Sequence, residues 1–166
     1  MFSRHALVLA AAVVALTGCG TAAPAVAPSP SVSASVALTI TDPWVKTTKE
    51  GMTAAFGTLV NNGDAPITIV SGSTPLSSVV ELHEVVESGG KMVMRPKKGG
   101  FVVPARGTHQ LQPGGDHIML MKVTEKVQPG ARIPFTLQVQ GGEPLEFTAV
   151  GKDFAGGEED YQPGHK

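Results

Sequence analysis

Short apolar runs recur about every ten residues along this chain, and they constrain its fold more than any other feature. The runs are rich in β-branched residues and are bounded by Gly, Pro, Asn or Asp. No stretch shows a convincing helical period. The 20 Gly and 13 Pro residues suit frequent turns better than long helices. This pattern predicts an all-β fold, an antiparallel Greek-key sandwich or barrel.

The expected strands define one domain. They cover 38–45, 52–60, 67–72, 79–86, 91–94, 101–103, 108–111, 116–121, 132–140 and 144–150. We place the domain at residues 38–152, a usual length for a single domain. Hydrophobic residues make up 42% of the chain, which is enough for a core. The single Trp, Trp44, is expected in that core or as a plug at the end of the barrel.

The candidate functional residues lie between Val79 and Met121. Strands at 79–86 and 91–94, with 87–90 as a four-residue turn, would form a hairpin that places His83 directly opposite Met94. Directly opposed residues project from one face of the sheet, with their side chains in reach of each other. The pairing depends on register, because a change of one residue in the turn would spoil it.

A second imidazole and thioether pair lies further along the chain. In the strand expected at 116–121, alternate side chains point to the same face. His117, Met119 and Met121 therefore share one face, and Ile118 and Leu120 face the core.

The side-chain chemistry of His83, Met94, His117 and Met119 favours Cu(I). Thioether sulfur is a soft, uncharged donor that selects Cu(I), and imidazole also suits copper. Ca²⁺ and Mg²⁺ prefer oxygen ligands. Structural zinc sites usually contain Cys, and blue copper needs a Cys thiolate, which this set lacks.

Plainer roles for the same residues stay open. A His in a strand is often a hydrogen-bonded surface residue, and a Met is often core filler. Met92 competes with Met94, and Met121 with Met119, because each pair shares a strand face. Met52 has no His paired with it in the sequence and is not expected to be a ligand.

The first 37 residues are interpreted as a targeting segment followed by a tether. Residues 1–18 begin with a positive charge at Arg4 and continue into an apolar run at 6–16, which is short for a membrane span. Leu16-Thr17-Gly18-Cys19 is similar to a bacterial lipobox, so Cys19, the only Cys, would be lipidated. An ordinary secretory signal is the alternative. Residues 20–37, rich in Ala, Pro and Ser, are interpreted as a tether.

Residues 153–166 are expected to form a flexible acidic tail. His165, together with the acidic residues Asp153, Glu158, Glu159 and Asp160, could form a weak secondary Cu(II) site, although a solvated tail is the favoured interpretation. The formal net charge of −1 gives no reason to expect nucleic-acid binding. We find no nucleophile elbow or phosphate loop, and we expect no enzymatic activity.

The four candidate ligands resemble the motif of the periplasmic copper chaperone family PCu(A)C, which is His, ten residues, Met, twenty-one residues, then His-x-Met. Ten residues separate His83 from Met94, and His117-Ile118-Met119 supplies the last part. Twenty-two residues separate Met94 from His117, one more than the family's pattern. We expect the extra residue in the loop at 97–100, where an insertion costs little.

The sequence around the motif also resembles the sequences of that family, over about residues 40–152. The matching segments are Asp42-Pro43-Trp44-Val45, the Asn61-Asn62-Gly63-Asp64 turn, Val80-Glu81-Leu82-His83, Met94-Arg95-Pro96, Val103-Pro104-Ala105, Leu111-Gln112-Pro113-Gly114-Gly115 and Met119-Leu120-Met121. The resemblance implies a cupredoxin-like fold.

The resemblance further implies a copper chaperone on the extracytoplasmic face of a bacterial membrane, held there by Cys19. It would deliver Cu(I) toward the binuclear centre of cytochrome c oxidase subunit II, with a Sco-type thiol protein in the same route. We expect a monomer. Two other functions stay open: a metal-free binding or adhesion sandwich on the cell surface, and a copper redox protein. The lack of a Cys and of a third His near the site disfavours the redox protein.

Overall fold

The computed structural model describes residues 37–156 and 160–161, all of which belong to one compact unit spanning 34–166. The described residues form strands and no helix, so none of their elements is a helix long and apolar enough to cross a membrane. The strands are β1 (Leu38–Lys46), β2 (Gly51–Asn61), β3 (Ile67–Ser73), β4 (Ser77–Ser88), β5 (Lys91–Pro96), β6 (Phe101–Val103), β7 (Thr108–Leu111), β8 (His117–Val123), β9 (Arg132–Val139), β10 (Leu145–Lys152) and β11 (Asp160–Tyr161).

All ten expected strands are confirmed, with ends that differ by at most two residues from the prediction. The additional strand is β11, which lies within the segment expected to be a tail. Runs of alternating burial explain the agreement: Arg132–Val139, for example, alternates between exposed and buried positions along most of its length. Period-two alternation is a local property, and a sequence reports it directly.

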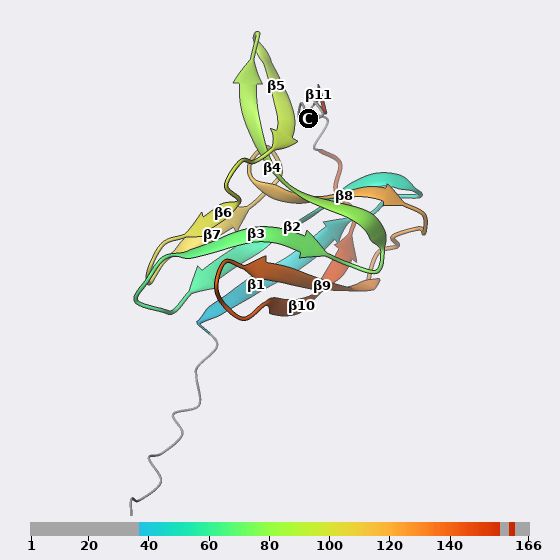
Figure 1. Ribbon diagram of the computed structural model, residues 1–166. Helices are drawn as coiled ribbons and strands as arrows, with labels where there is room; N and C mark the ends of the chain where they lie inside the picture. Colours follow the sequence, from blue (N-terminus) through green and yellow to red (C-terminus); the bar gives the residue numbers. More distant parts are fainter. Residues whose placement is uncertain (1–36, 157–159, 162–166) are drawn as a thin grey trace, which may run out of the picture. The chain divides into compact units, whose positions relative to one another are not determined.

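The strands hydrogen-bond in the order β11-β5-β4-β8-β2-β1-β10-β9-β3-β6, with β7 also paired to β2 (Figure 1). The pairs are antiparallel except for β1 with β10 and β5 with β11. The long strand β2 pairs with β8 through its first half and with β7 through its second half, so it belongs to two parts of the sheet. The fold is therefore the all-β, cupredoxin-like sandwich that was expected.

The core lies between the two layers and is aliphatic with a few aromatic side chains. Leu59, Ile69, Phe101 and Leu137 are completely buried. Ile118 and Leu120 are also completely buried, which confirms the face assigned to them on β8. Complete burial of such a side chain stabilises the fold by about 1.5–3 kcal/mol.

Trp44 is neither a fully buried core residue nor isolated at the surface. A bulge in β1 shifts the pairing between Thr41 and Trp44, and Asp42 at this bulge has a φ of 49°. Trp44 is half-buried, with its ring centroid 4.5 Å from that of Phe56 and 5.5 Å from that of Phe154. It packs at the end of the sheet that carries the candidate site.

Candidate metal site

The β4–β5 hairpin turns through two residues, Gly89 and Gly90, with φ values of 62° and 78°. Positive φ at both turn positions is typical of a type I′ turn, which glycine adopts without strain. Pairing therefore continues to Ser88 and Lys91, and His83 lies opposite Pro96. The prediction that His83 lies directly opposite Met94 was wrong, because the turn has two residues and not four.

The corrected register still leaves His83 and Met94 on one face. Met94 lies opposite Val85, two residues along β4 from His83. A shift of two residues preserves the face of every side chain, whereas a shift of one would reverse it. The two side chains are therefore diagonal neighbours, which remain within reach for long side chains such as Met.

Pairing between β4 and β8 brings the two imidazoles together. His83 lies directly opposite His117, with ring centroids 5.5 Å apart and planes at 66°. His83 is completely buried, and His117 is 4% exposed. Glu81 lies opposite Met119 on the same face. The pair of His83 and His117 joins two residues that are far apart in the sequence, and no local pattern predicts it.

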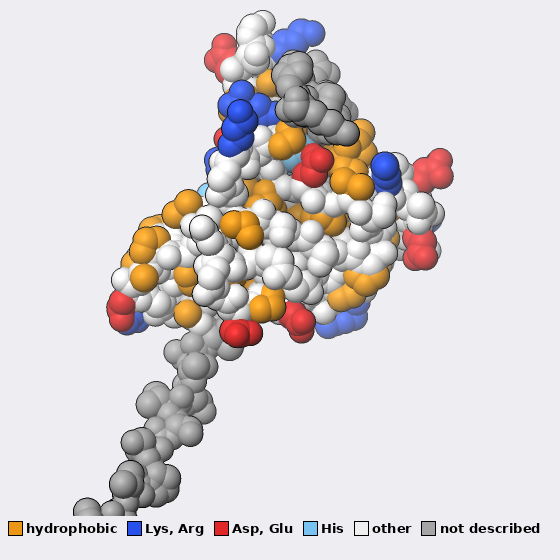
Figure 2. Space-filling view, viewed as in Figure 1, with side chains coloured by type: hydrophobic (Ala, Val, Ile, Leu, Met, Phe, Trp, Pro, Cys, Tyr) orange, Lys and Arg blue, Asp and Glu red, His pale blue; other side chains and the backbone are white. Residues whose placement is uncertain are grey.

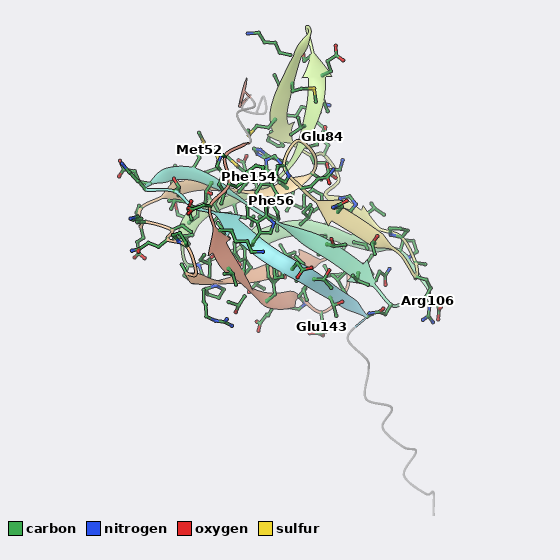
Figure 3. The ribbon with its side chains drawn as sticks, turned by 180° about the vertical axis from the view of Figure 1, so that it is seen from behind. Met52, Phe56, Glu84, Arg106, Glu143 and Phe154 are labelled. Carbon is green, nitrogen blue, oxygen red and sulfur yellow. The ribbon has the colours of Figure 1, made fainter. Side chains whose placement is uncertain are left out.

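Strand β2 forms the third side of the arrangement. Ala54 pairs with Met119, so Met52, Ala54 and Phe56 alternate along the face that carries Met119. The ring centroid of Phe56 is 6.1 Å from that of His117. Figure 3 shows Met52, Phe56 and Phe154 near one another at the end of the sheet from which the β4–β5 hairpin rises.

A hollow of about 460 Å³ opens at this point, and we call it the site hollow. Its lining includes Met94, His117 and Met119, and also Met52. His83 does not line the hollow, but its ring packs edge-on against that of His117. The structure thus brings three of the four candidate ligands to one cavity and the fourth into contact with one of them. Figure 2 shows hydrophobic side chains gathered at the base of the hairpin, with a His and an acidic group among them.

The alternative sulfurs, Met92 and Met121, do not line the site hollow. Met92 lies opposite Glu87 toward the tip of the hairpin and is 49% exposed. Met121 lies opposite Val79, further along β8. By contrast, Met52 does line it, although its sequence context did not indicate a ligand. Only the pairing of β2 with β8 shows its place, and no local pattern in the sequence reports that pairing.

Hydrogen bonds set the tautomers of both imidazoles. His117 Nδ1 donates to the carbonyl oxygen of Gly115 at 2.9 Å, so the lone pair of the neutral ring is on Nε2. His83 Nε2 donates to Glu81 Oε2 at 2.7 Å. A carboxylate that orients a His in this way is a common support for a metal ligand.

Burial lowers the pKa of His83, and the nearby Glu81 carboxylate offsets part of that effect. Burial thus favours the neutral ring, which is the form that binds metals.

A network of charged groups lies beside the site. Glu84 accepts hydrogen bonds from Arg95 at 3.0 Å and from Lys97 at 3.1 Å, and Lys97 also lies 3.4 Å from Asp116. Asp116 in turn accepts a hydrogen bond from His109 Nε2 at 2.8 Å. Burial acts to raise the pKa of Glu84, but the two hydrogen bonds outweigh it and the pKa is lowered. Burial acts to lower the pKa of Lys97, and its two carboxylate partners raise it overall. Lys97 thus links the hairpin to the loop before His117.

The beginning of the segment expected to be a flexible tail packs on the domain. Thr47 Oγ1 donates to Asp153 Oδ1 at 2.7 Å. The ring of Phe154 packs on Trp44, and Lys46 Nζ lies 5.9 Å from the centroid of the Phe154 ring. Phe154 and Gly156 both line the site hollow. Together, these apolar and polar contacts attach residues 153–156 to β1. The composition of the segment does not suggest this attachment.

The C-terminal strand β11 pairs in parallel with β5, with Tyr161 beside Met94. The side chains of the secondary site predicted around His165 lie outside the described residues, apart from Asp153. Cys19, the signal at 1–18 and almost all of the tether also lie outside them. Within the described part of the chain, no three His, Cys, Asp or Glu side chains gather closely enough to hold a metal ion.

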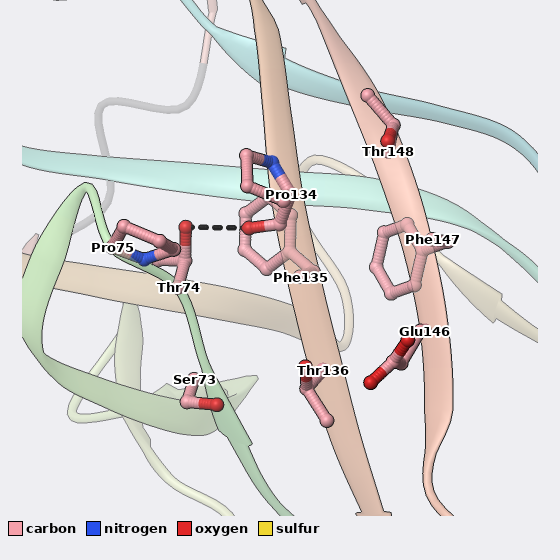
Figure 4. A pocket seen from close by; sticks show the side chains of 9 residues that line it. All are labelled: Ser73, Thr74, Pro75, Pro134, Phe135, Thr136, Glu146, Phe147 and Thr148. Atoms are coloured by element: carbon pink, nitrogen blue, oxygen red, sulfur yellow. Dashed lines mark hydrogen bonds between the residues drawn. The ribbon is translucent and has the colours of Figure 1, made fainter.

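A second hollow, of about 650 Å³, lies over β9 and β10 (Figure 4). The stacked rings of Phe135 and Phe147, with centroids 5.2 Å apart, lie in its floor. Thr74 Oγ1 donates to the carbonyl oxygen of Pro134 at 2.7 Å along one side. Its lining contains no His, Met or Cys and offers no soft ligand.

Comparison with known proteins identifies the family of this chain. The family described as "Putative lipoprotein LpqE-like" matches residues 38–150. A putative lipoprotein of Leifsonia xyli subsp. xyli is 37% identical over 158 residues, which is 95% of each chain.

Solved structures are similar as well. Apo-DR1885 from Deinococcus radiodurans is 30% identical, with a TM-score of 0.57 over 90% of this chain and 100% of that one. The Cu(I) form of DR1885 is 32% identical, with a TM-score of 0.53 over 76% and 87% of the two chains. The copper-bound PCuAC domain from PmoF2 has a TM-score of 0.59 over 70% of this chain and 93% of that one, and at 17% identity it supports the fold alone. The chain belongs to the LpqE-like family of putative lipoproteins, whose domain is of the PCuAC type.

Proposed function

We propose that this protein is an extracytoplasmic copper chaperone that carries Cu(I) on His83, Met94, His117 and Met119. One observation carries the proposal: two thioethers and one imidazole from β5 and β8 line a single hollow, and the second imidazole, from β4, packs against the first. The Cu(I) form of a relative that is 32% identical supports the choice of metal. Copper is cargo in this proposal and not a resident cofactor, and no enzymatic step is required.

The donor set suits a carrier. All four ligands are neutral, so the bound ion keeps its single positive charge and can pass to a site that offers thiolates. Met94 and Met119 are 9% and 5% exposed, which keeps water away from the metal. Neutral ligands can be replaced one at a time, so copper need not leave the protein as a free ion.

We further propose that lipidation at Cys19 anchors the chaperone to the outer face of the membrane. Both the family and the relative from Leifsonia xyli are described as putative lipoproteins, which supports this location. The proposed recipient is the binuclear copper centre of cytochrome c oxidase subunit II, reached directly or through a Sco-type thiol protein. A recipient in the same membrane would be within reach of a tethered domain.

Titration of the full chain in detergent with Cu(I), against a competing chelator, tests the proposal. We expect tight binding of one Cu(I) per chain. X-ray absorption of the loaded protein should then report two sulfur and two nitrogen neighbours. Failure to bind one Cu(I) tightly would favour the metal-free adhesion sandwich.

A further inference from the structure

Met52 occupies the rim of the site hollow, where the pairing of β2 with β8 is irregular. Gly51 pairs with Val123, but Thr53 pairs with Leu120, so Met52 faces two residues of β8. One of these, Lys122, has a φ of 52°, which marks the bulge. Bulges redirect side chains and are frequent beside functional sites.

Exposure orders the three sulfurs of the site hollow from inside to outside. Met119 is 5% exposed, Met94 is 9% exposed and Met52 is 49% exposed. Met92 has the same 49% exposure but does not line the hollow. Among these residues, Met52 is therefore the methionine that both lines the cavity and is exposed to solvent. A partner or chelator approaching from outside would encounter it before the two buried sulfurs.

We propose that Met52 is a transfer ligand, a sulfur that binds copper transiently during loading and release. This inference rests on the proposed function of the same site. During release, a bond forms between Cu(I) and the Met52 sulfur as a bond to one inner ligand breaks. The copper stays Cu(I), and no electron or proton moves. Ligands of the acceptor then displace the remaining inner ligands and Met52 one at a time, so that each new bond to copper replaces one that breaks, and loading follows the same steps in reverse.

The physical reason is that a copper ion with too few ligands is high in free energy. An ion that leaves buried thioethers without a new ligand would lose favourable bonds before it gained others. A long, flexible and polarizable Met side chain at the rim offers a bond at that moment. Because the four inner ligands hold the resting ion, Met52 should affect the rate of exchange and not the equilibrium affinity.

The test compares Met52→Leu with the matched control Met92→Leu, both in the full chain in detergent. Leu keeps the size and apolar character of Met but removes the sulfur. Release of Cu(I) to excess bathocuproine disulfonate is followed by stopped-flow absorbance. We expect Met52→Leu to release copper about fivefold more slowly, equivalent to about 1 kcal/mol of activation free energy, and Met92→Leu to match the wild type. Since affinity is unchanged, loading should slow by the same factor.

A second variant, Met52→Ala, separates a ligand from a plug. If Met52 only blocks the opening, Ala should speed release and Leu should leave it unchanged, and either result would overturn the proposal. Support requires slower release in both variants, with an unchanged number of sulfur neighbours in the resting site by X-ray absorption. Wild-type protein that fails to bind Cu(I) would instead refute the proposed function itself.

Discussion

Removal of the Phe154 side chain should detach the segment that packs beside the site hollow. Phe154 lies against Trp44, and residues 153–156 meet the domain mainly through that ring, through Asp153 and through contacts from Lys46. Phe154→Ala removes the largest apolar contact of this segment and leaves the strands of the sheet intact. We therefore expect local detachment and not global unfolding.

The magnitude follows from burial. Phe154 is 39% exposed, so about three fifths of its side chain is covered. Complete burial of a large apolar side chain contributes about 1.5–3 kcal/mol, which gives about 1–2 kcal/mol here. The aromatic pair adds about 0.5–1.5 kcal/mol. A loss of about 2 kcal/mol would raise the detached population about 30-fold.

Trp44 reports this change directly, because the chain contains one Trp. In Phe154→Ala its emission should move to longer wavelength, and acrylamide should quench it more efficiently. Val102→Ala serves as the control, since Val102 is an exposed apolar residue of β6 that is 52% accessible. Emission and quenching that do not change in Phe154→Ala would refute the packing of this segment on Trp44.

Three further predictions concern the site and its support. Met119→Ala should weaken Cu(I) binding by at least about tenfold, because even the loss of a residue that only supports a metal ligand costs about that much. The loss of affinity should be larger than in Met121→Ala, as measured by chelator competition. Because the pKa of His83 is lowered in the folded state, the unfolded chain binds more protons at low pH. The apo protein should therefore lose stability as the pH falls below 6.5. Urea unfolding should show that His83→Gln reduces this loss of stability. Lys97→Met should cost about 1 kcal/mol through two partly exposed ion pairs and lower the melting temperature by a few degrees, whereas Lys98→Met should have little effect.

Local patterns predicted most of the fold, and non-local pairing accounts for what they missed. The alternation in 116–121 correctly assigned Ile118 and Leu120 to the core, because side-chain direction in a strand depends only on sequence position. The turn at 87–90 misled the register, since Glu-Ser-Gly-Gly allows a loop of four or of two residues. The error was two residues, so the faces of His83 and Met94 were still assigned correctly.

The opposition of His83 and His117 could not be predicted in the same way. It depends on which strands become neighbours, and thirty-three residues separate the two positions along the chain. The place of Met52 depends on the pairing of β2 with β8, whose paired residues are even farther apart in the sequence. Packing of Phe154 on Trp44 joins the two ends of the domain. None of these contacts has a local signal, because each arises only when the sheet closes.

His83 is the residue at which β4 changes partners. Up to His83 the strand pairs with β8, and from His83 onward it pairs with β5. Three candidate ligands therefore lie in the body of the sheet, whereas Met94 is carried by a hairpin whose other described neighbour is the short strand β11. The position of Met94 relative to the other three depends on how the hairpin meets the body. Lys97 joins the two by its ion pairs at 3.1 Å and 3.4 Å, so its loss should weaken Cu(I) binding even where the fold survives.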